Sequence, residues 1–237
     1  METLKYKERF ARNFESICSN HSKFTVWSDF IHMIAYSISN SCDYKQERED
    51  SYLAIVKRYS KSETEKLSEL FALTVLALEE NRYQDFLGQV YMDYGFGDTR
   101  KGEYFTPYDI AALITKLAQS EQVDEVPYVT VNDPACGSGV MLIAFANEMI
   151  KEGATLHQQL FVIANDLDPC IALMCYIQLS LLGCAGYVCI RNTLSEPVEG
   201  SVYHPPADAF LTPLFFHPVW QTRRLLKSMR RANNECS

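Results

Sequence analysis

The feature that most constrains the fold is a glycine turn between a β-rich segment and an apolar helix. Asp133-Pro134-Ala135-Cys136-Gly137-Ser138-Gly139 closely follows the strand-forming residues 126–131 and precedes the apolar run 140–146. Gly137 and Gly139 carry no Cβ, so the backbone can bend sharply there and approach a ligand closely. A strand, a tight glycine turn and a helix form the nucleotide-binding corner of doubly wound α/β folds. The run therefore predicts an α/β sheet with a ligand site at the end of this strand.

The residues after this turn continue the same alternation. We predict strands at 128–132, 160–165 and 186–190, separated by helices near 139–151 and 169–182. Alternating strands and helices give a parallel sheet with right-handed crossovers, and ligands of such sheets lie beyond the carboxyl ends of the strands. Three polar residues follow these strands directly and are expected to meet in one pocket: Asp133, Asp166 and Asn192.

The first part of the chain has a different pattern. Residues 4 to about 93 show helical periodicity, with apolar residues recurring every three or four positions. A glycine-rich and charged stretch, 94–102, separates this part from the α/β pattern. We therefore predict a helical N-terminal region over residues 1–95 and an α/β domain over residues 96–237.

Asp133 indicates the charge of the expected ligand. The turn does not have the G-x-G-x-x-G spacing of dinucleotide sites, and a carboxylate at the strand end would repel a pyrophosphate. S-adenosylmethionine carries a positively charged sulfonium and an amino group, both of which suit a carboxylate. The sequence therefore favours S-adenosylmethionine as the cofactor.

Three further blocks accompany the glycine turn. They are Asp85-Phe86-Leu87-Gly88-Gln89-Val90-Tyr91, Gly102-Glu103-Tyr104-Phe105-Thr106-Pro107 and Ala164-Asn165-Asp166-Leu167-Asp168-Pro169. Together with the turn, and in this order, they resemble the motifs of N6-adenine DNA methyltransferases, especially the modification subunits of type I restriction–modification systems. The resemblance spans about residues 82–195 and implies a Rossmann-like, S-adenosylmethionine-dependent methyltransferase fold, here in a short or orphan form with a truncated sheet.

The resemblance also implies roles for individual residues. Asp133 would accept a hydrogen bond from the methionyl amino group, and Asp166 would accept both ribose hydroxyls, because a carboxylate has two acceptor oxygens. Asn192 would bond the adenine edge, although Arg191 stands where the family often has glycine. Two alternatives stay open: Asp166 as a solvated carboxylate, and the aromatic pair of the second block as packing residues. The full predicted cofactor set is Tyr104, Phe105, Thr106, Asp133, Pro134, Cys136, Gly137, Gly139, Asp166 and Asn192.

The catalytic motif of the family is altered in this chain. N6-adenine methyltransferases carry Asn/Asp-Pro-Pro-Phe/Tyr after the fourth strand, where the motif holds the target amino group and stacks on the flipped base. His204-Pro205-Pro206-Ala207 retains both prolines, whereas Thr212-Pro213-Leu214-Phe215 retains one proline and the ring. The second segment follows residues 208–211, which resemble a short fourth strand. We therefore assign the catalytic positions to Thr212, Pro213 and Phe215.

Charge limits the ways in which the chain could bind DNA. Its net charge is −8, which argues against a protein that coats DNA by itself, since phosphate binding normally uses a basic surface. A local exception is a C-terminal run whose cations share a helical face and are expected to contact phosphates: Arg223, Arg224, Lys227, Arg230 and Arg231. A solvated terminal helix is the alternative for this run.

Cysteine and histidine spacing indicates no metal site. The eight cysteines include no C-x-x-C pair and the five histidines are scattered, which is typical of buried thiols in a reducing cytosol. The sequence opens without a signal peptide and has no apolar stretch of membrane-spanning length. We therefore predict a cytoplasmic protein with no membrane partner.

Three classes of function remain. The leading hypothesis is methyl transfer from S-adenosylmethionine to adenine N6 in DNA, with a specificity subunit or a second copy as the expected partner. The second is a catalytically inactive cofactor-binding, regulatory or decoy protein that partners restriction–modification subunits, which the altered motif favours. The third is a methyltransferase acting on a small molecule or a protein, against which the helical region and the second block argue.

Overall fold

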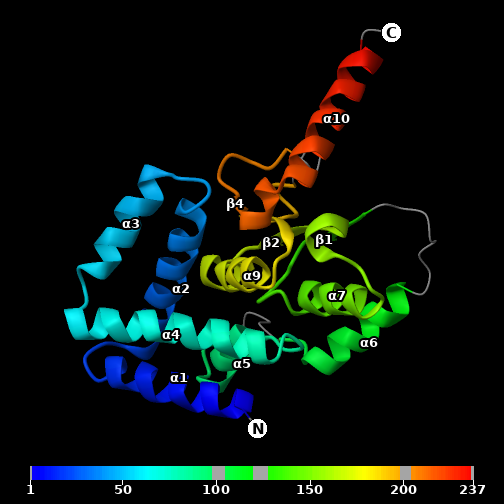
Figure 1. Ribbon diagram of the computed structural model, residues 1–237. Coiled ribbons are helices and arrows are strands. Elements are labelled where there is room, and N and C mark those ends of the chain that lie inside the picture. The colour runs from blue at the N-terminus through cyan, green and yellow to red at the C-terminus, as the bar shows by residue number, and fades with distance from the viewer. Residues whose placement is uncertain (1, 98–104, 120–127, 198–203, 236–237) are drawn as a thin grey trace.

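The computed structural model describes residues 2–97, 105–119, 128–197 and 204–235 (Figure 1). Its strands are β1 (Val129–Asp133), β2 (Leu160–Asp166), β3 (Ala185–Ile190) and β4 (Phe210–Leu211). Its helices are α1 (Glu2–Cys18), α2 (Lys23–Asn40), α3 (Gln46–Val56), α4 (Lys61–Glu80), α5 (Phe86–Asp93), α6 (Tyr108–Gln119), α7 (Val140–Lys151), α8 (Leu156–Gln159), α9 (Pro169–Leu181), the 3-10 turn η2 (Pro213–Phe216) and α10 (Pro218–Glu235).

The sheet has the strand order β1-β2-β3-β4. The first three strands run parallel, with Asp133 opposite Ala164 and Asp166 opposite Ile190. Each of the three predicted strands is present, and its ends differ from the prediction by no more than one residue. The predicted α/β fold class with a helical N-terminus is confirmed. The fourth strand is the exception, because β4 pairs with β3 in the antiparallel direction.

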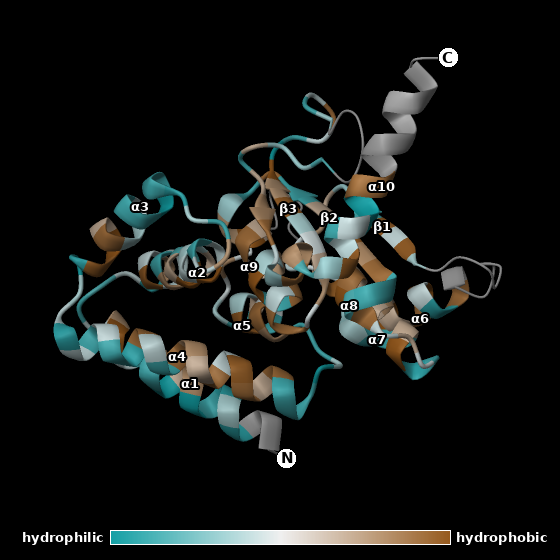
Figure 2. Cartoon of the chain, turned by 45° about the horizontal axis from the view of Figure 1, so that its top comes forward, coloured by the Kyte–Doolittle hydropathy of each residue, from teal (hydrophilic) through white to brown (hydrophobic). Residues whose placement is uncertain are grey.

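Both faces of the sheet are covered. Leu160, Val162 and Ala164 belong to a core that continues through α7 and α9 into the N-terminal helices. The side chains that alternate with them, Phe161 and Ile163, pack on the other face with residues of η2 and α10. A strand buried on both faces is expected to be apolar throughout, and Figure 2 shows β2 and β3 mostly in hydrophobic brown.

The N-terminal helices are part of the same packed structure. α1 lies along α4, and α2 lies between α3 and α9 (Figure 1). Phe10, Phe14 and Trp27 are fully buried and share one core with the apolar side of α9. Over the residues that the structure describes, no helix combines the length and the apolar character needed to cross a bilayer.

Arg48 of α3 fixes β4 to the helical region. Its side chain is buried, and its guanidinium carbon lies 4.1 Å from the centroid of the Phe210 ring. Nη2 donates to the Ala209 carbonyl at 2.9 Å and to the Asp208 carbonyl at 3.3 Å. An Asp43 carboxylate oxygen lies 3.6 Å from Nη1. Arg48 therefore supplies a donor to the Ala209 carbonyl, which is buried.

We expect Arg48→Met to lower the free energy of unfolding by about 1–3 kcal/mol, because the Ala209 carbonyl loses its donor. Urea unfolding followed by circular dichroism measures this change. Arg9→Met is the matched control, since the Arg9–Glu69 ion pair is exposed and is expected to contribute less than about 1 kcal/mol. Equal losses in the two variants would contradict a special role for Arg48.

Candidate functional site

The loops that follow β1, β2 and β3 meet at one edge of the sheet. The backbone N–H of Cys136 donates to the Asn165 carbonyl at 2.8 Å, and that of Arg191 donates to the Asp166 carbonyl at 3.0 Å. The Thr193 hydroxyl donates to the Pro134 carbonyl at 2.8 Å. The carboxyl edge therefore brings together the strand-end residues that the sequence singled out, Asp133, Asp166 and Asn192.

Asp166 holds two of these loops with one carboxylate. Its Oδ2 accepts from the Gly137 N–H at 2.9 Å, and its Oδ1 accepts from the Asp168 N–H at 3.0 Å. Each carboxylate oxygen can accept more than one hydrogen bond, so both oxygens retain capacity for ligand hydroxyls. Asp166 is half-buried and is thus both a structural acceptor and a candidate ligand contact.

Asp133 gives this edge a second carboxylate. Burial raises the pKa of Asp133 above its ordinary value, and the nearby Asp166 carboxylate raises it further. The Ala135 N–H, which donates to Asp133 Oδ1 at 3.1 Å, partly offsets these effects. Two carboxylates close enough for Asp166 to raise the pKa of Asp133 favour a positively charged ligand group. This arrangement fits the amino and sulfonium groups of S-adenosylmethionine.

The glycine turn leaves room for close approach. Gly139 is the N-cap of α7 and has φ +96°, a left-handed conformation that favours glycine. A Cβ on Gly139 would lie 2.7 Å from the Cys175 Sγ, whereas a Cβ on Gly137 would lie 3.4 Å from the Phe105 ring. The turn is therefore closed on the α9 side by Cys175 and faces Phe105 on another side.

Phe105 and Thr106 connect the turn to the helical region. The Phe105 ring packs edge-to-face on Tyr91 of α5, with the ring centroids 5.6 Å apart. Phe105 and Thr106 also border a cleft of about 550 Å³ between α5 and the start of α6. Tyr104, the third predicted residue of this block, lies outside the described residues.

Sequence reasoning missed the residues that support the turn from the opposite side. Asp85 was noted only as part of a motif, and Gln178 was not noted at all. Both side chains are buried beside Ser138 and are hydrogen-bonded to one another. The sequence did contain one signal of this network. Gln178 is a glutamine within the mostly apolar helix α9, and a buried glutamine needs a polar partner.

The structure places the predicted catalytic residues Thr212, Pro213 and Phe215 away from these loops. Because β4 is antiparallel to β3, its carboxyl end lies at the amino edge of the parallel strands, opposite the loops described above. The Thr212 hydroxyl is fully buried, accepts from the Gly186 N–H at 3.0 Å and donates to the Gly186 carbonyl at 3.2 Å. Pro213 begins η2, and Phe215 is buried in the core on that face. All three residues have structural roles.

The other partial motif lies at the carboxyl edge instead. Arg191, which directly follows β3, donates from Nη2 to Asp208 Oδ1 at 2.9 Å. Lys45 of the helical region donates to the Ala207 carbonyl. Residues 204–208 therefore enter β4 from the same side as the Asn192 loop.

Comparison with known proteins identifies a family for most of the chain. Residues 83–235 match the sequence profile of the N-6 DNA Methylase family. The chain belongs to this family. The match begins with the block that contains Asp85 and includes the glycine turn and both strand-end aspartates, so the resemblance seen in the sequence is confirmed.

Individual relatives of this family member are distant. The Type I restriction enzyme MjaIX methylase subunit of Methanocaldococcus jannaschii is 26% identical over 124 residues, which cover 50% of this chain and 21% of the relative. The matched region is therefore about a fifth of that relative's length. A solved structure from Listeria monocytogenes, described as a class I S-adenosylmethionine-dependent methyltransferase, has a TM-score of 0.45 and 13% identity, covering 84% of this chain and 57% of that one.

Two of the five basic residues predicted to contact DNA hold α10 of this methylase-family chain in place. The Arg223 guanidinium lies 4.3 Å from the Tyr128 ring centroid and donates to the Gln158 carbonyl. The Arg224 guanidinium lies 3.9 Å from the Phe215 ring centroid and donates to the Phe215 carbonyl at 2.9 Å. The side chains of the other three, Lys227, Arg230 and Arg231, lie outside the described residues.

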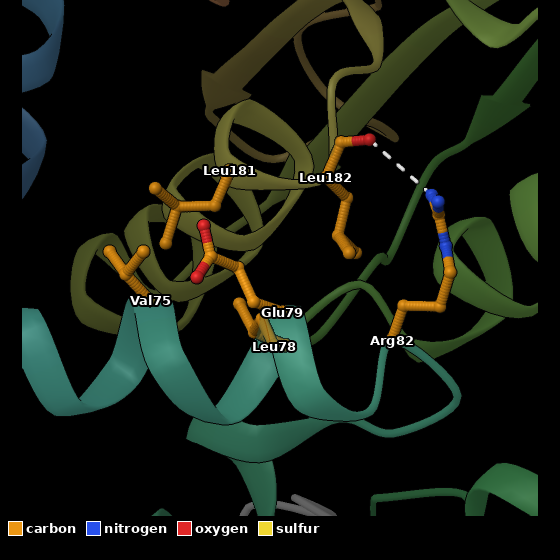
Figure 3. Close-up of a pocket in the computed structure, with 6 residues that line it drawn as sticks. All are labelled: Val75, Leu78, Glu79, Arg82, Leu181 and Leu182. Carbon is orange, nitrogen blue, oxygen red and sulfur yellow. Dashed lines mark hydrogen bonds between the residues drawn. The ribbon is translucent and has the colours of Figure 1, made fainter.

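A smaller cavity lies away from the carboxyl edge, at the seam between α4 and α9 (Figure 3). It has a volume of about 200 Å³, and Arg82 donates across it to the Leu182 carbonyl at 3.5 Å. Its other lining residues are Val75, Leu78, Glu79 and Leu181. None of the predicted cofactor residues lines it, so it is separate from the candidate site.

Proposed function

We propose that this chain binds S-adenosylmethionine at the carboxyl edge of its sheet and serves methyl transfer to adenine N6 in DNA. The observation that carries the proposal is the hydrogen bond between the glycine turn and the end of β2, in which the Gly137 N–H donates to Asp166 at 2.9 Å. Membership of the N-6 DNA Methylase family supports both the cofactor and the reaction.

Different residues at this edge would contact different parts of the cofactor. Asp133 would accept from the methionyl amino group, Asp166 from the ribose hydroxyls, and Asn192 would contact the adenine. Phe105, Thr106, Pro134, Cys136, Gly137 and Gly139 would form the walls. When bound, S-adenosylmethionine supplies an electrophilic methyl group, and the residues of this chain hold it in a fixed orientation.

We assign binding of the methyl acceptor, the target adenine, to residues 204–208 together with a partner protein. This segment keeps two prolines of the family motif, and the Arg191–Asp208 ion pair ties it to the cofactor edge. A specificity subunit or a second copy would supply further contacts to DNA, along with the distal part of α10. Such a system is expected to work in the cytoplasm, where DNA and the cofactor are available.

A second candidate is a catalytically inactive cofactor-binding or regulatory protein that partners restriction–modification subunits. The observation that favours it is the burial of Thr212 at the amino edge. It places the partial catalytic motif that retains an aromatic ring away from the cofactor loops. The 237 residues contain no Asn/Asp-Pro-Pro-Phe/Tyr tetrapeptide elsewhere.

Tritiated methyl transfer to unmethylated DNA, with calorimetry of cofactor binding in parallel, decides between the two candidates. We expect the unmodified chain to bind S-adenosylmethionine and Asp133→Ala to bind it about tenfold to a hundredfold more weakly, the effect of one lost charged hydrogen bond. Label in N6-methyladenine that is absent with Asp133→Ala establishes the enzyme. Binding without label, in an assay that also contains a type I specificity subunit, supports the inactive protein, and no binding would contradict both candidates.

A further inference from the structure

A buried carboxylate of the helical region lies directly behind the glycine turn. Asp85 is 4% exposed and is the N-cap of α5, where its Oδ1 accepts from the Gly88 N–H at 2.9 Å. An N-cap is normally an exposed feature of a helix end, and one hydrogen bond satisfies it. The burial of Asp85 and its further partners are therefore more than capping requires.

These further partners belong to the turn and to α9. The Ser138 hydroxyl donates to Asp85 Oδ2. Gln178 Nε2 donates to Asp85 Oδ1 at 2.8 Å and to the Ser138 carbonyl at 2.9 Å, and its Oε1 accepts from the Leu87 N–H at 3.2 Å. Asp85, Ser138 and Gln178 thus form a closed, fully buried network, which we call the turn support.

The local backbone is shaped to allow this contact. A Cβ on Gly88 would overlap the Asp85 carboxylate and would lie 2.5 Å from the Ser138 Oγ. Any side chain at this position would separate α5 from the turn. The glycine of the Asp-x-x-Gly block therefore permits the close approach that the turn support needs.

The turn support acts on the central residue of the turn. Ser138 stands between Gly137, whose N–H donates to Asp166, and Gly139, which begins α7. Both neighbours are glycines with positive φ, so neither contributes a side chain that could hold this backbone. The N–H groups on either side have acceptors of their own, Asp166 for Gly137 and the Cys136 carbonyl for Gly139. The hydrogen bonds of Ser138 add the contact that ties this backbone to α5 and α9.

We propose that Asp85, through Ser138 and Gln178, is a positioning residue for the cofactor site, so that the N-terminal helical region sets the affinity of the turn for its ligand. This inference rests on the proposed function in that the ligand is S-adenosylmethionine. It adds that cofactor affinity depends on the hydrogen bonds that Asp85 makes to Ser138 and Gln178 behind the turn.

The first test compares Ser138→Ala with a control of similar chemistry. Ser138→Ala is expected to weaken S-adenosylmethionine binding about tenfold in calorimetry, the effect of one lost hydrogen bond to a charged group. Tyr59→Phe is the matched control, because it removes a comparable buried bond, Tyr59 hydroxyl to Asp29 Oδ2 at 2.8 Å, inside the helical region. It is expected to lower the melting temperature and leave the affinity unchanged. Equal weakening in both variants would overturn the proposal.

Replacements at Asp85 separate positioning from simple destabilisation. An asparagine at residue 85 can accept from Gly88 and Gln178 through its oxygen and donate to the Ser138 hydroxyl through its nitrogen. Asp85→Asn is therefore expected to keep the affinity within about threefold, whereas Asp85→Ala reproduces the loss of Ser138→Ala. If Ser138→Ala and Asp85→Ala both bind S-adenosylmethionine as tightly as the unmodified chain does, the inference is wrong.

Hydrogen exchange of residues 136–140, measured without cofactor, distinguishes this inference from the proposed function. We expect faster exchange of these amides in Ser138→Ala than in the unmodified chain, and no change in Tyr59→Phe. If the unmodified chain fails to bind S-adenosylmethionine but exchange still accelerates, the proposed function fails and the turn support stands. Unchanged exchange in Ser138→Ala contradicts the turn support, whatever the ligand.

Discussion

Asp166→Asn is expected to weaken binding of S-adenosylmethionine by about a hundredfold. Both carboxylate oxygens accept backbone N–H groups, from Gly137 at 2.9 Å and from Asp168 at 3.0 Å. An amide would turn its NH₂ toward one of these N–H groups in either orientation, so one bond is replaced by a repulsive contact. The joint between the glycine turn and β2 would open at the point where the ribose is proposed to bind.

Asp168→Asn is the matched control for this prediction. Asp168 is the N-cap of α9, and its Oδ1 accepts from the N–H groups of Cys170 at 2.8 Å and Ile171 at 3.1 Å. Asparagine caps a helix as well as aspartate does, so the affinity measured by calorimetry should hardly change. An Asp166→Asn variant that binds as tightly as Asp168→Asn would refute the dual role of Asp166.

Gly139→Ala is expected to lower the free energy of unfolding by about 2–5 kcal/mol. Two costs add at this position. The backbone has φ +96°, which strains any residue with a side chain, and the new methyl group would lie 2.7 Å from the Cys175 Sγ. Urea unfolding of the variant beside the unmodified chain measures the sum of the two.

Two further variants separate strain from overlap. Gly153 has a similar φ of +88° and nothing within 4 Å of a Cβ, so Gly153→Ala should cost only the strain, about 1–2 kcal/mol. Adding Cys175→Ala to Gly139→Ala removes the overlapping sulfur and is expected to restore part of the difference. A loss no larger at Gly139 than at Gly153 would show that Cys175 does not close the turn.

Local pattern was enough to predict the parallel sheet and the residues that end its strands. β2 is buried at six of its seven residues and its first five residues are all apolar, so its position in the sequence is clear. The aspartates that end β1 and β2 interrupt apolar runs, which marks the carboxyl edge directly. These features depend on neighbours in the sequence, and the structure agrees with them.

The direction of β4 could not be predicted in the same way. β4 has two residues, too few for any alternation to develop, and both its position and its direction are fixed by distant groups. Gly186 pairs with the Thr212 hydroxyl, and Arg48 binds the carbonyls before Phe210. The sequence indicated that Thr212 follows a short strand, but it could not indicate at which edge of the sheet that strand ends.

The turn support escaped prediction for a related reason. A glutamine in an apolar helix signals a buried polar partner, but the sequence does not say which one. The partner of Gln178 is Asp85, which is 93 residues away and belongs to a different region of the chain. Contacts of this kind appear only when the helical region and the sheet are seen packed together.

The hydrogen bond between Arg48 and the Ala209 carbonyl also has a consequence while the protein is being translated, because the two residues are 161 positions apart. Ribosomes add about 5–20 residues per second, so Arg48 emerges roughly 10–30 s before its partner exists. During that interval the nascent chain carries an arginine that has not yet met its native acceptors, and the apolar surfaces of α2 and α3 beside it remain accessible. Chaperones that bind nascent chains are therefore expected to engage the N-terminal helices until residues 207–210 have left the ribosome.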